Sequence, residues 1–163
     1  MGKKEDIIKF LKVVKEKGHK FWLENPKELI EYLEEYDIDI WFSTEGTAQW
    51  PKEPKFLDGD LLSVAKGTIV AVNSDLLPPS VPAGIPERGV DFGLDAVTLD
   101  KEMNIEFSTE ILYEKLYRNK LSFTDGDVLL QGDGVTIQNI ELIKSFVPKA
   151  IELGLDALSF YFY

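Results

Sequence analysis

Hydrophobic positions near the start of the chain recur with the period of an α-helix. The apolar side chains of one helical face are Ile7, Phe10, Leu11 and Val14. Their i, i+3, i+4, i+7 spacing predicts an amphipathic helix over residues 4–17. Gly18 follows directly, and glycine readily takes the left-handed conformation that ends helices. We therefore expect the first helix to stop at Gly18.

A second helix is indicated by the dipeptide Asn25-Pro26. An asparagine side chain accepts hydrogen bonds from free helix amides, and proline has no amide to leave unpaired. Glu28 completes a pattern that resembles a capping box. The prediction is a helix from Pro26 to about Tyr36. Together the two helices would form a helical hairpin over residues 1–37, joined by a connector that holds His19, Phe21 and Trp22.

From Asp37 onward the pattern changes to that of short β-strands. Residues 38–42, 61–64 and 68–72 are rich in β-branched, aromatic and leucine side chains and are bounded by turn residues. Residues 95–99 and 104–109 predict a β-hairpin around the turn at 100–103. The proline-rich stretch 78–86 fits neither a regular helix nor a central strand, so we expect a loop there.

The strand-rich part of the chain contains the same blocks twice, in the same order. The pairs are Phe42-Ser43-Thr44-Glu45 with Phe107-Ser108-Thr109-Glu110, Asp58-Gly59-Asp60 with Asp125-Gly126-Asp127, Gly67 with Gly134, Asn73 with Asn139, and Gly93-Leu94-Asp95-Ala96 with Gly154-Leu155-Asp156-Ala157. Recurrence in one order is typical of internal duplication. A single copy would expose strand edges, which a second copy would cover.

These patterns predict the fold class α+β. We expect an N-terminal helical hairpin packed on a pseudo-twofold, duplicated and mainly antiparallel β unit, arranged as a small barrel or as two packed sheets. The 163 residues suit one domain, divided into a helical hairpin over 1–37, a first segment over 38–99 and a second segment over 100–163.

Composition excludes several kinds of chemistry. The chain has no cysteine and one histidine, His19. Disulfides, thiolate metal sites, cysteine nucleophiles and metal sites built from several histidines of one chain are thereby ruled out. A Ser-His-Asp triad would have to use His19 near a helix end. No cofactor motif is present, so we expect no cofactor, and whether the protein is an enzyme stays open. Sixteen lysines against two arginines suit a thermophile.

The net charge is −11 and is unevenly distributed. Residues 1–20 hold seven lysines against three acids, whereas the rest of the chain is strongly acidic. An acidic protein is a poor partner for nucleic acid. No apolar run reaches the roughly 20 residues of a membrane span, and no signal-peptide core is present, so we expect neither membrane insertion nor export but a cytoplasmic location.

The recurring acids are the main candidates for a site. They are Glu45, Glu110, Asp60, Asp127, Asp95 and Asp156. Brought together, they would offer oxygen ligands to a hard cation, or a carboxyl pair in which one member has a raised pKa. Alternatively, each acid accepts hydrogen bonds from turn amides, which needs no ligand. The spacing of a calcium-binding loop is absent.

Trp50 is the other candidate, because a tryptophan beside a proline in a loop is suited to contact a ligand. These observations favour a non-catalytic binding or assembly module. Its site for a protein or a small molecule would lie between the two segments, near Trp50 and the loop 78–86. The alternative is a metal- or carboxylate-dependent hydrolase that uses the recurring acids.

Overall fold

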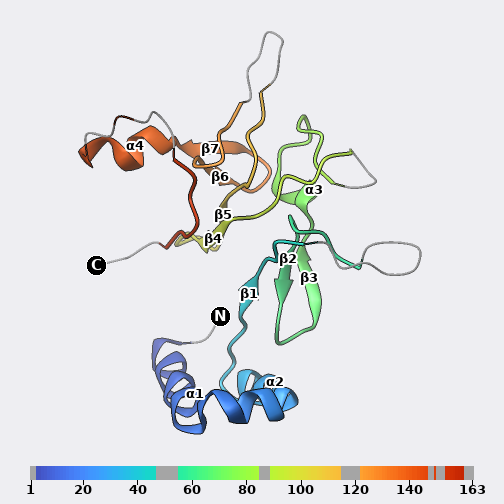
Figure 1. Cartoon of the computed structure of the whole chain (residues 1–163), viewed down its shortest axis with the longest axis vertical. Helices are drawn as coiled ribbons and strands as arrows, with labels where there is room; N and C mark the ends of the chain where they lie inside the picture. The colour runs from blue at the N-terminus through green and yellow to red at the C-terminus, as the bar shows by residue number, and fades with distance from the viewer. Residues whose placement is uncertain are drawn as a thin grey trace. The chain divides into compact units, whose positions relative to one another are not determined.

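A computed structural model describes residues 3–46, 55–84, 89–114, 122–146, 149 and 153–159. It contains helices and two antiparallel sheets, which confirms the α+β class (Figure 1). The chain forms two compact units. Unit one comprises Met1–Phe42 and Leu62–Val70, and unit two comprises Ser43–Leu61 and Ala71–Tyr163. The single domain expected from sequence stays a prediction.

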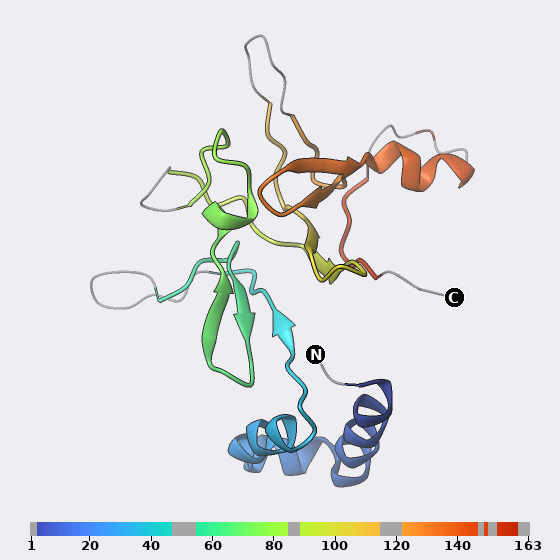
Figure 2. The same cartoon turned by 180° about the vertical axis from the view of Figure 1, so that it is seen from behind.

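Unit one begins with helix α1 (Lys4–Glu24), which extends past the expected end at Gly18. Gly18 has φ 75° and ψ 164°, so the helix kinks there and then resumes (Figure 2). The predicted non-helical connector is therefore wrong, because His19, Phe21 and Trp22 are helical. The indole Nε1 of Trp22 donates to the Val14 carbonyl (3.0 Å), a contact that spans the kink. A glycine stops one helix, but it does not prevent the next turn from forming.

Helix α2 (Pro26–Glu35) begins at the proline, as predicted. The expected side-chain cap from Asn25 is wrong. Asn25 instead donates through Nδ2 to the Phe21 carbonyl (2.9 Å), so it satisfies the end of α1 rather than the start of α2. Glu28 pairs with Lys17 (3.3 Å), which ties the two helices together. Because α2 begins two residues after α1 ends, the Asn25 side chain can reach the last carbonyls of α1 as well as the first amides of α2.

Unit one has a small core of Phe10, Leu33 and Ile38, one from each helix and one from the chain that follows. Val64 and Ala65, in the turn after strand β2, pack against this core. The adjoining sheet has the order β1 (Trp41–Phe42), β2 (Leu61–Ser63) and β3 (Thr68–Ala71). Strands β1 and β2 are antiparallel. The helical hairpin is therefore held against the β2–β3 turn.

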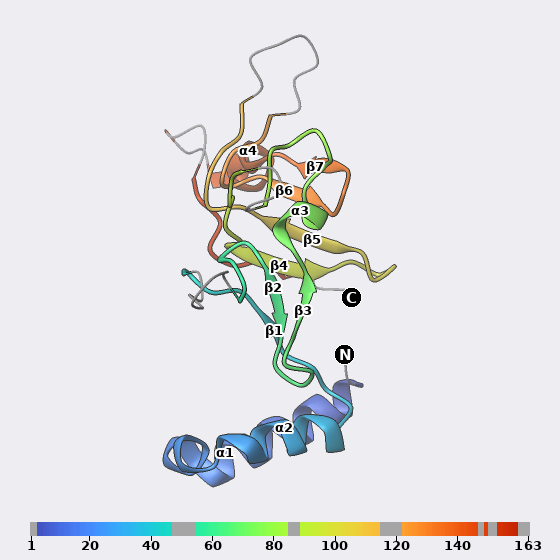
Figure 3. The same cartoon turned by 90° about the vertical axis from the view of Figure 1, so that its right-hand side faces the viewer.

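The second sheet lies in unit two and has four strands in the order of the chain. They are β4 (Ala96–Leu99), β5 (Ile105–Ser108), β6 (Val128–Leu130) and β7 (Gly134–Ile137). The β4–β5 hairpin forms where the sequence predicts it (Figure 3). The described strands form two separate open sheets and close no barrel, so that part of the prediction is wrong. The barrel would require hydrogen bonds between outer strands, which sequence periodicity does not reveal.

Equivalent strands pair in the same register in the two segments. Phe42 of β1 is opposite Leu62 of β2, and Phe107 of β5 is opposite Leu129 of β6. A short helix follows the third strand in both cases. Helix α3 (Asn73–Leu76) follows β3, whereas α4 (Asn139–Ile143) and a 3₁₀ turn, η1 (Lys144–Phe146), follow β7.

The described part of the proline-rich stretch contributes to the core of unit two. Val81 and Ala83 are fully buried, and the Gly84 amide donates to the Val90 carbonyl (2.6 Å). This stretch is a loop, as predicted, but its apolar residues belong to the interior. Within the described residues, no helix combines the length and the apolar character needed to cross a membrane.

Candidate functional site

Two of the recurring acids, Asp60 and Asp127, are buried and hold turns. Asp60 accepts hydrogen bonds from the amides of Leu57 (2.9 Å) and Asn73 (3.0 Å), one at each carboxylate oxygen. Asp127 accepts in the same way from the amides of Thr124 (2.9 Å) and Asn139 (2.7 Å). A carboxylate that joins two backbone donors fixes a turn to the start of a helix.

The two asparagines complete these frames. Asn73 donates through Nδ2 to the Gly59 carbonyl (3.3 Å) and accepts through Oδ1 from the Phe92 amide (3.2 Å). Asn139 donates to the Gly126 carbonyl (3.0 Å) and accepts from the Leu153 amide (2.7 Å). Each aspartate with its asparagine, which we call an Asp–Asn frame, links a turn, a helix start and the residue that precedes the Gly-Leu-Asp-Ala block.

The other four recurring acids line one open pocket of about 400 Å³ in unit two, which we call the acidic pocket. Its lining residues are Ser43, Thr44, Glu45, Leu94, Asp95, Glu110 and Asp156. Both Phe-Ser-Thr-Glu blocks and both Gly-Leu-Asp-Ala blocks contribute a carboxylate. Asp95 and Glu110 are half-buried, whereas Glu45 and Asp156 are exposed.

Serine hydroxyls position these blocks. Ser43 donates through Oγ to the Leu94 carbonyl (2.6 Å), and Ser108 donates to the Leu155 carbonyl (3.1 Å). Because each serine lies two residues before a glutamate and each leucine lies one residue before an aspartate, these contacts bring the acids of the two blocks near one another. The pocket thus follows from hydrogen bonds between blocks far apart in the sequence.

The carboxylates of the acidic pocket influence one another electrostatically. Burial, then the charges of Asp156, Asp125 and Glu45, raise the pKa of Asp95. Burial, then the charges of Asp58, Asp95 and Glu45, raise the pKa of Glu110. Like charges at short distance disfavour full ionisation. A cation in the pocket would relieve this repulsion and return both pKa values toward their usual range.

The chemistry of the pocket is that of an unneutralised anionic site. None of its described lining residues is basic. Among the described residues, no group of three or more histidine, cysteine, aspartate or glutamate side chains has an arrangement suited to hold a metal ion. The pocket therefore offers charge and hydrogen-bond acceptors, but its carboxylates are not converged on one point.

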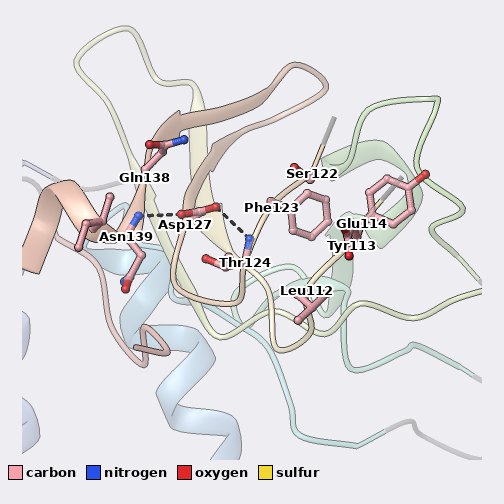
Figure 4. Close-up of a pocket in the computed structure, with 10 residues that line it drawn as sticks. Leu112, Tyr113, Glu114, Ser122, Phe123, Thr124, Asp127, Gln138 and Asn139 are labelled. Atoms are coloured by element: carbon pink, nitrogen blue, oxygen red, sulfur yellow. Dashed lines mark hydrogen bonds between the residues drawn. The ribbon is translucent and has the colours of Figure 1, made fainter. Parts of the chain in front are cut away.

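A second pocket of about 410 Å³ lies wholly within the second segment (Figure 4). It is lined by Leu112, Tyr113, Glu114, Ser122, Phe123, Thr124, Asp127, Gln138, Asn139 and Ile140. Asp127, bonded to Thr124 and Asn139, forms part of its wall. The carboxylate of Asp127 is thus already engaged in the Asp–Asn frame. The buried Thr124 hydroxyl has no partner among the described residues.

Sequence reasoning missed two acids that the structure makes prominent. Asp39 accepts from the Ser63 hydroxyl (2.7 Å), the Ala65 amide (3.0 Å) and the Trp41 indole (3.0 Å). Asp91 accepts from the amides of two glycines near the acidic pocket. A signal for Asp91 was present, because an acid stands two residues before the glycine in both Gly-Leu-Asp-Ala blocks.

Trp50, the remaining candidate, lies outside the described residues. Comparison of the chain with protein-family models, curated proteins and solved structures gives no significant match. The assignment of a function therefore depends on the residues of this chain alone.

Proposed function

We propose that this protein is a non-catalytic binding module whose ligand site is the acidic pocket between the two recurring segments. The observation that carries the proposal is that four recurring carboxylates, two from each segment, line one pocket. The remaining two recurring acids are engaged in the Asp–Asn frames. The six recurring acids thus fall into two sets: two that hold turns and four that are open to a ligand.

The proposal includes an internal duplication that produced the pocket. Its support is the shared order of sequence blocks, the matching strand register and the matching hydrogen bonds of the two Asp–Asn frames. In this view, residues 38–99 and 100–163 are copies related by an approximate twofold. The acids at equivalent positions then come in pairs, which is why a pocket between the copies is unusually rich in carboxylates.

The ligand class that fits is a cationic group, such as an amine or a basic side chain of a partner protein. Carboxylates stabilise a cation by charge and by charge-assisted hydrogen bonds. An extended ammonium ligand needs no convergent ligand sphere, unlike a small metal ion. The open form of the pocket and its spread carboxylates favour the amine.

Isothermal titration calorimetry at low ionic strength tests this proposal. The probes are spermidine, lysine amide and, separately, calcium, magnesium and manganese chloride. We expect binding of spermidine that weakens as salt is added. Asp95→Asn and Glu110→Gln should each reduce the affinity about tenfold, because each removes one charge from the pocket at near-constant shape.

Asp133→Asn is the matched control, because Asp133 is an exposed acid in the β6–β7 turn and does not line the acidic pocket. This variant removes the same charge from the whole protein, so it corrects for non-specific attraction. Absence of heat with every cation would overturn the proposal. Equal weakening by Asp133→Asn and Asp95→Asn would overturn it as well.

A carboxylate-dependent hydrolase is the second candidate. It is favoured by the raised pKa values of Asp95 and Glu110 beside acids whose charges contribute to those shifts. Such a pair can supply a general acid and a base in one pocket. A screen with chromogenic esters, phosphates and glycosides tests it. Turnover that is lost in Glu110→Gln and kept in Asp133→Asn would favour the hydrolase over the binding module.

A further inference from the structure

Asp58 and Asp91 bring two carboxyl groups together in a partly buried place beside the acidic pocket. Oδ1 of Asp58 and Oδ2 of Asp91 are both buried, and neither has a hydrogen-bond partner in the described structure when both groups are ionised. Asp91 uses its other oxygen, Oδ1, to accept from the amides of Gly59 (3.0 Å) and Gly93 (3.3 Å). One oxygen of Asp91 is thus anchored, while the other remains available to Asp58.

A single proton would satisfy both orphaned oxygens. Two ionised carboxylates repel, whereas a carboxyl group and a carboxylate can share one short hydrogen bond. We propose that Asp58 and Asp91 form a proton-linked clasp, which joins the turn 58–60 to the segment 91–93 while one proton is shared and loosens when that proton is lost.

The neighbouring backbone shows what the clasp would hold. The Gly59 amide of the turn contacts Asp91 directly. A Cβ at Gly59 would collide with the side chains of Asn73 and Asp91, so the turn is closely packed at this point. The Glu110 amide donates to the Phe92 carbonyl (3.0 Å), so the segment 91–93 also supports the acidic pocket.

The charged groups around the clasp agree with proton uptake. Burial and the hydrogen bond with Asp58, followed by the Asp58 charge, raise the pKa of Asp91 to about 7, against the opposing effect of the Gly93 and Gly59 amides. The charge of Asp58 also acts on Glu110, two residues after the end of β5. Asp60 on the turn is bonded to backbone amides. Each of these neighbours is a carboxylate, so the surroundings disfavour a second negative charge on the pair.

The expected pH dependence has a definite sign. The pKa of Asp91 is raised from an ordinary value of 3.8 to about 7 in the folded protein. The folded state therefore holds a proton that the unfolded state releases. Its stabilising contribution is complete below about pH 4, declines as the pH rises, and is lost above about pH 7.

Urea unfolding followed by circular dichroism between pH 5 and pH 8 tests the clasp in the full-length protein. For the wild type we expect the folding constant to fall by on the order of tenfold, after allowance for solvent screening of a partly exposed pair. In Asp91→Asn the amide Nδ2 replaces Oδ2 and donates permanently to Asp58, while Oδ1 keeps both glycine contacts. Most of the pH dependence should then disappear.

Asp58→Asn provides the same replacement from the other side, and Asp133→Asn controls for general charge. A pH dependence unchanged in both Asp58→Asn and Asp91→Asn would overturn the proposal. NMR titration of wild-type protein labelled with ¹³C at aspartate carboxyl carbons needs no variant. One aspartate titrating near neutral pH supports the clasp, and ordinary acidic titration of all aspartates overturns it. These readouts use no ligand, so they are independent of cation binding.

Discussion

The two Asp–Asn frames have the same hydrogen bonds but different surroundings. In the first, the turn glycine Gly59 also donates to Asp91, and the side chains of Asn73 and Asp91 leave no space at its Cα. In the second, Gly126 lies against the side chain of Asn139 and the backbone carbonyl of Leu153. The same hydrogen bonds form in both frames although the surrounding residues differ. We therefore infer that the fold requires these hydrogen bonds. The differing contacts identify Asp91 as a titratable group that is held by the first turn glycine.

The largest effect is expected from removal of the frame carboxylates. Asp60→Ala and Asp127→Ala each leave two backbone amides without an acceptor, at a cost of about 4 kcal/mol in the free energy of unfolding. Urea unfolding by circular dichroism measures this cost. The three tryptophans all lie at or before residue 50, so their fluorescence would report mainly on the first part of the chain.

Equal losses for the two variants would support equivalent frames. Amide hydrogen exchange gives a local reading, because Asp60→Ala should speed exchange at Asn73 more than at Asn139, and Asp127→Ala should do the reverse. A loss below about 1 kcal/mol for either variant would show that its frame is not a structural requirement.

The turn glycines should separate the two segments. A Cβ at either glycine would strike the asparagine side chain of its frame. At Gly126 it would also strike the Leu153 carbonyl, whereas at Gly59 it would also strike the Asp91 side chain. Backbone yields less readily than side chains, so we expect Gly126→Ala to cost about 3 kcal/mol and Gly59→Ala about 2 kcal/mol. Thermal unfolding of both variants measures the difference. Gly46→Ala is the control, because a Cβ at Gly46 would meet open space and the backbone there does not need a glycine. Gly132→Ala is less suitable, because Gly132 has a φ of 74°.

The smallest effect is expected at Asp39, which has no carboxylate equivalent in the second segment, where Asn104 stands at the offset of 65 residues. Although burial opposes it, hydrogen bonds from Ser63, Ala65 and Trp41, helped by the Lys66 charge, lower the pKa of Asp39. The stability that this group contributes is therefore present above about pH 4 and is lost as the pH falls below that value.

Asp39→Asn should cost about 1 kcal/mol at pH 7 and less at pH 3, where the wild-type carboxylate is itself protonated. Tryptophan fluorescence during urea unfolding suits this variant, since Trp41 donates to Asp39. Asn104→Ala serves for comparison, because Asn104 forms its hydrogen bonds within the β4–β5 turn, with Asp100. A cost for Asp39→Asn that is the same at both pH values would contradict the role assigned to the carboxylate.

Local sequence patterns predicted helix α2, the β4–β5 hairpin and the class of the fold, because each depends on neighbours within a few residues. The same patterns failed where a distant or later group intervened. The kink at Gly18 is followed by further helix, and the indole of Trp22 reaches back across it. Asn25 bonds the preceding helix because the Phe21 carbonyl, which also accepts from the Asn25 amide, lies within reach of its side chain.

The candidate site, too, could be predicted from the sequence only in part. Recurrence in the sequence singled out all six acids, since identical blocks are visible without a structure. It gave no means to tell the four in the acidic pocket from the two in the Asp–Asn frames. Asp60 and Glu45 are both acids in recurring blocks, but only the folded chain shows that Asp60 accepts from backbone amides and that Glu45 lines a pocket.

The sequence by itself determined the composition of this protein, its excluded chemistries and the existence of two matching segments. The tertiary structure alone decided which carboxylates meet. Asp58 and Asp91 are 33 residues apart, and nothing in the spacing predicts that two buried oxygens would be left without separate partners. The physical reason is that the pKa of a carboxyl group depends on burial and on the charges around it, and both are fixed only when the distant parts of the chain are folded together.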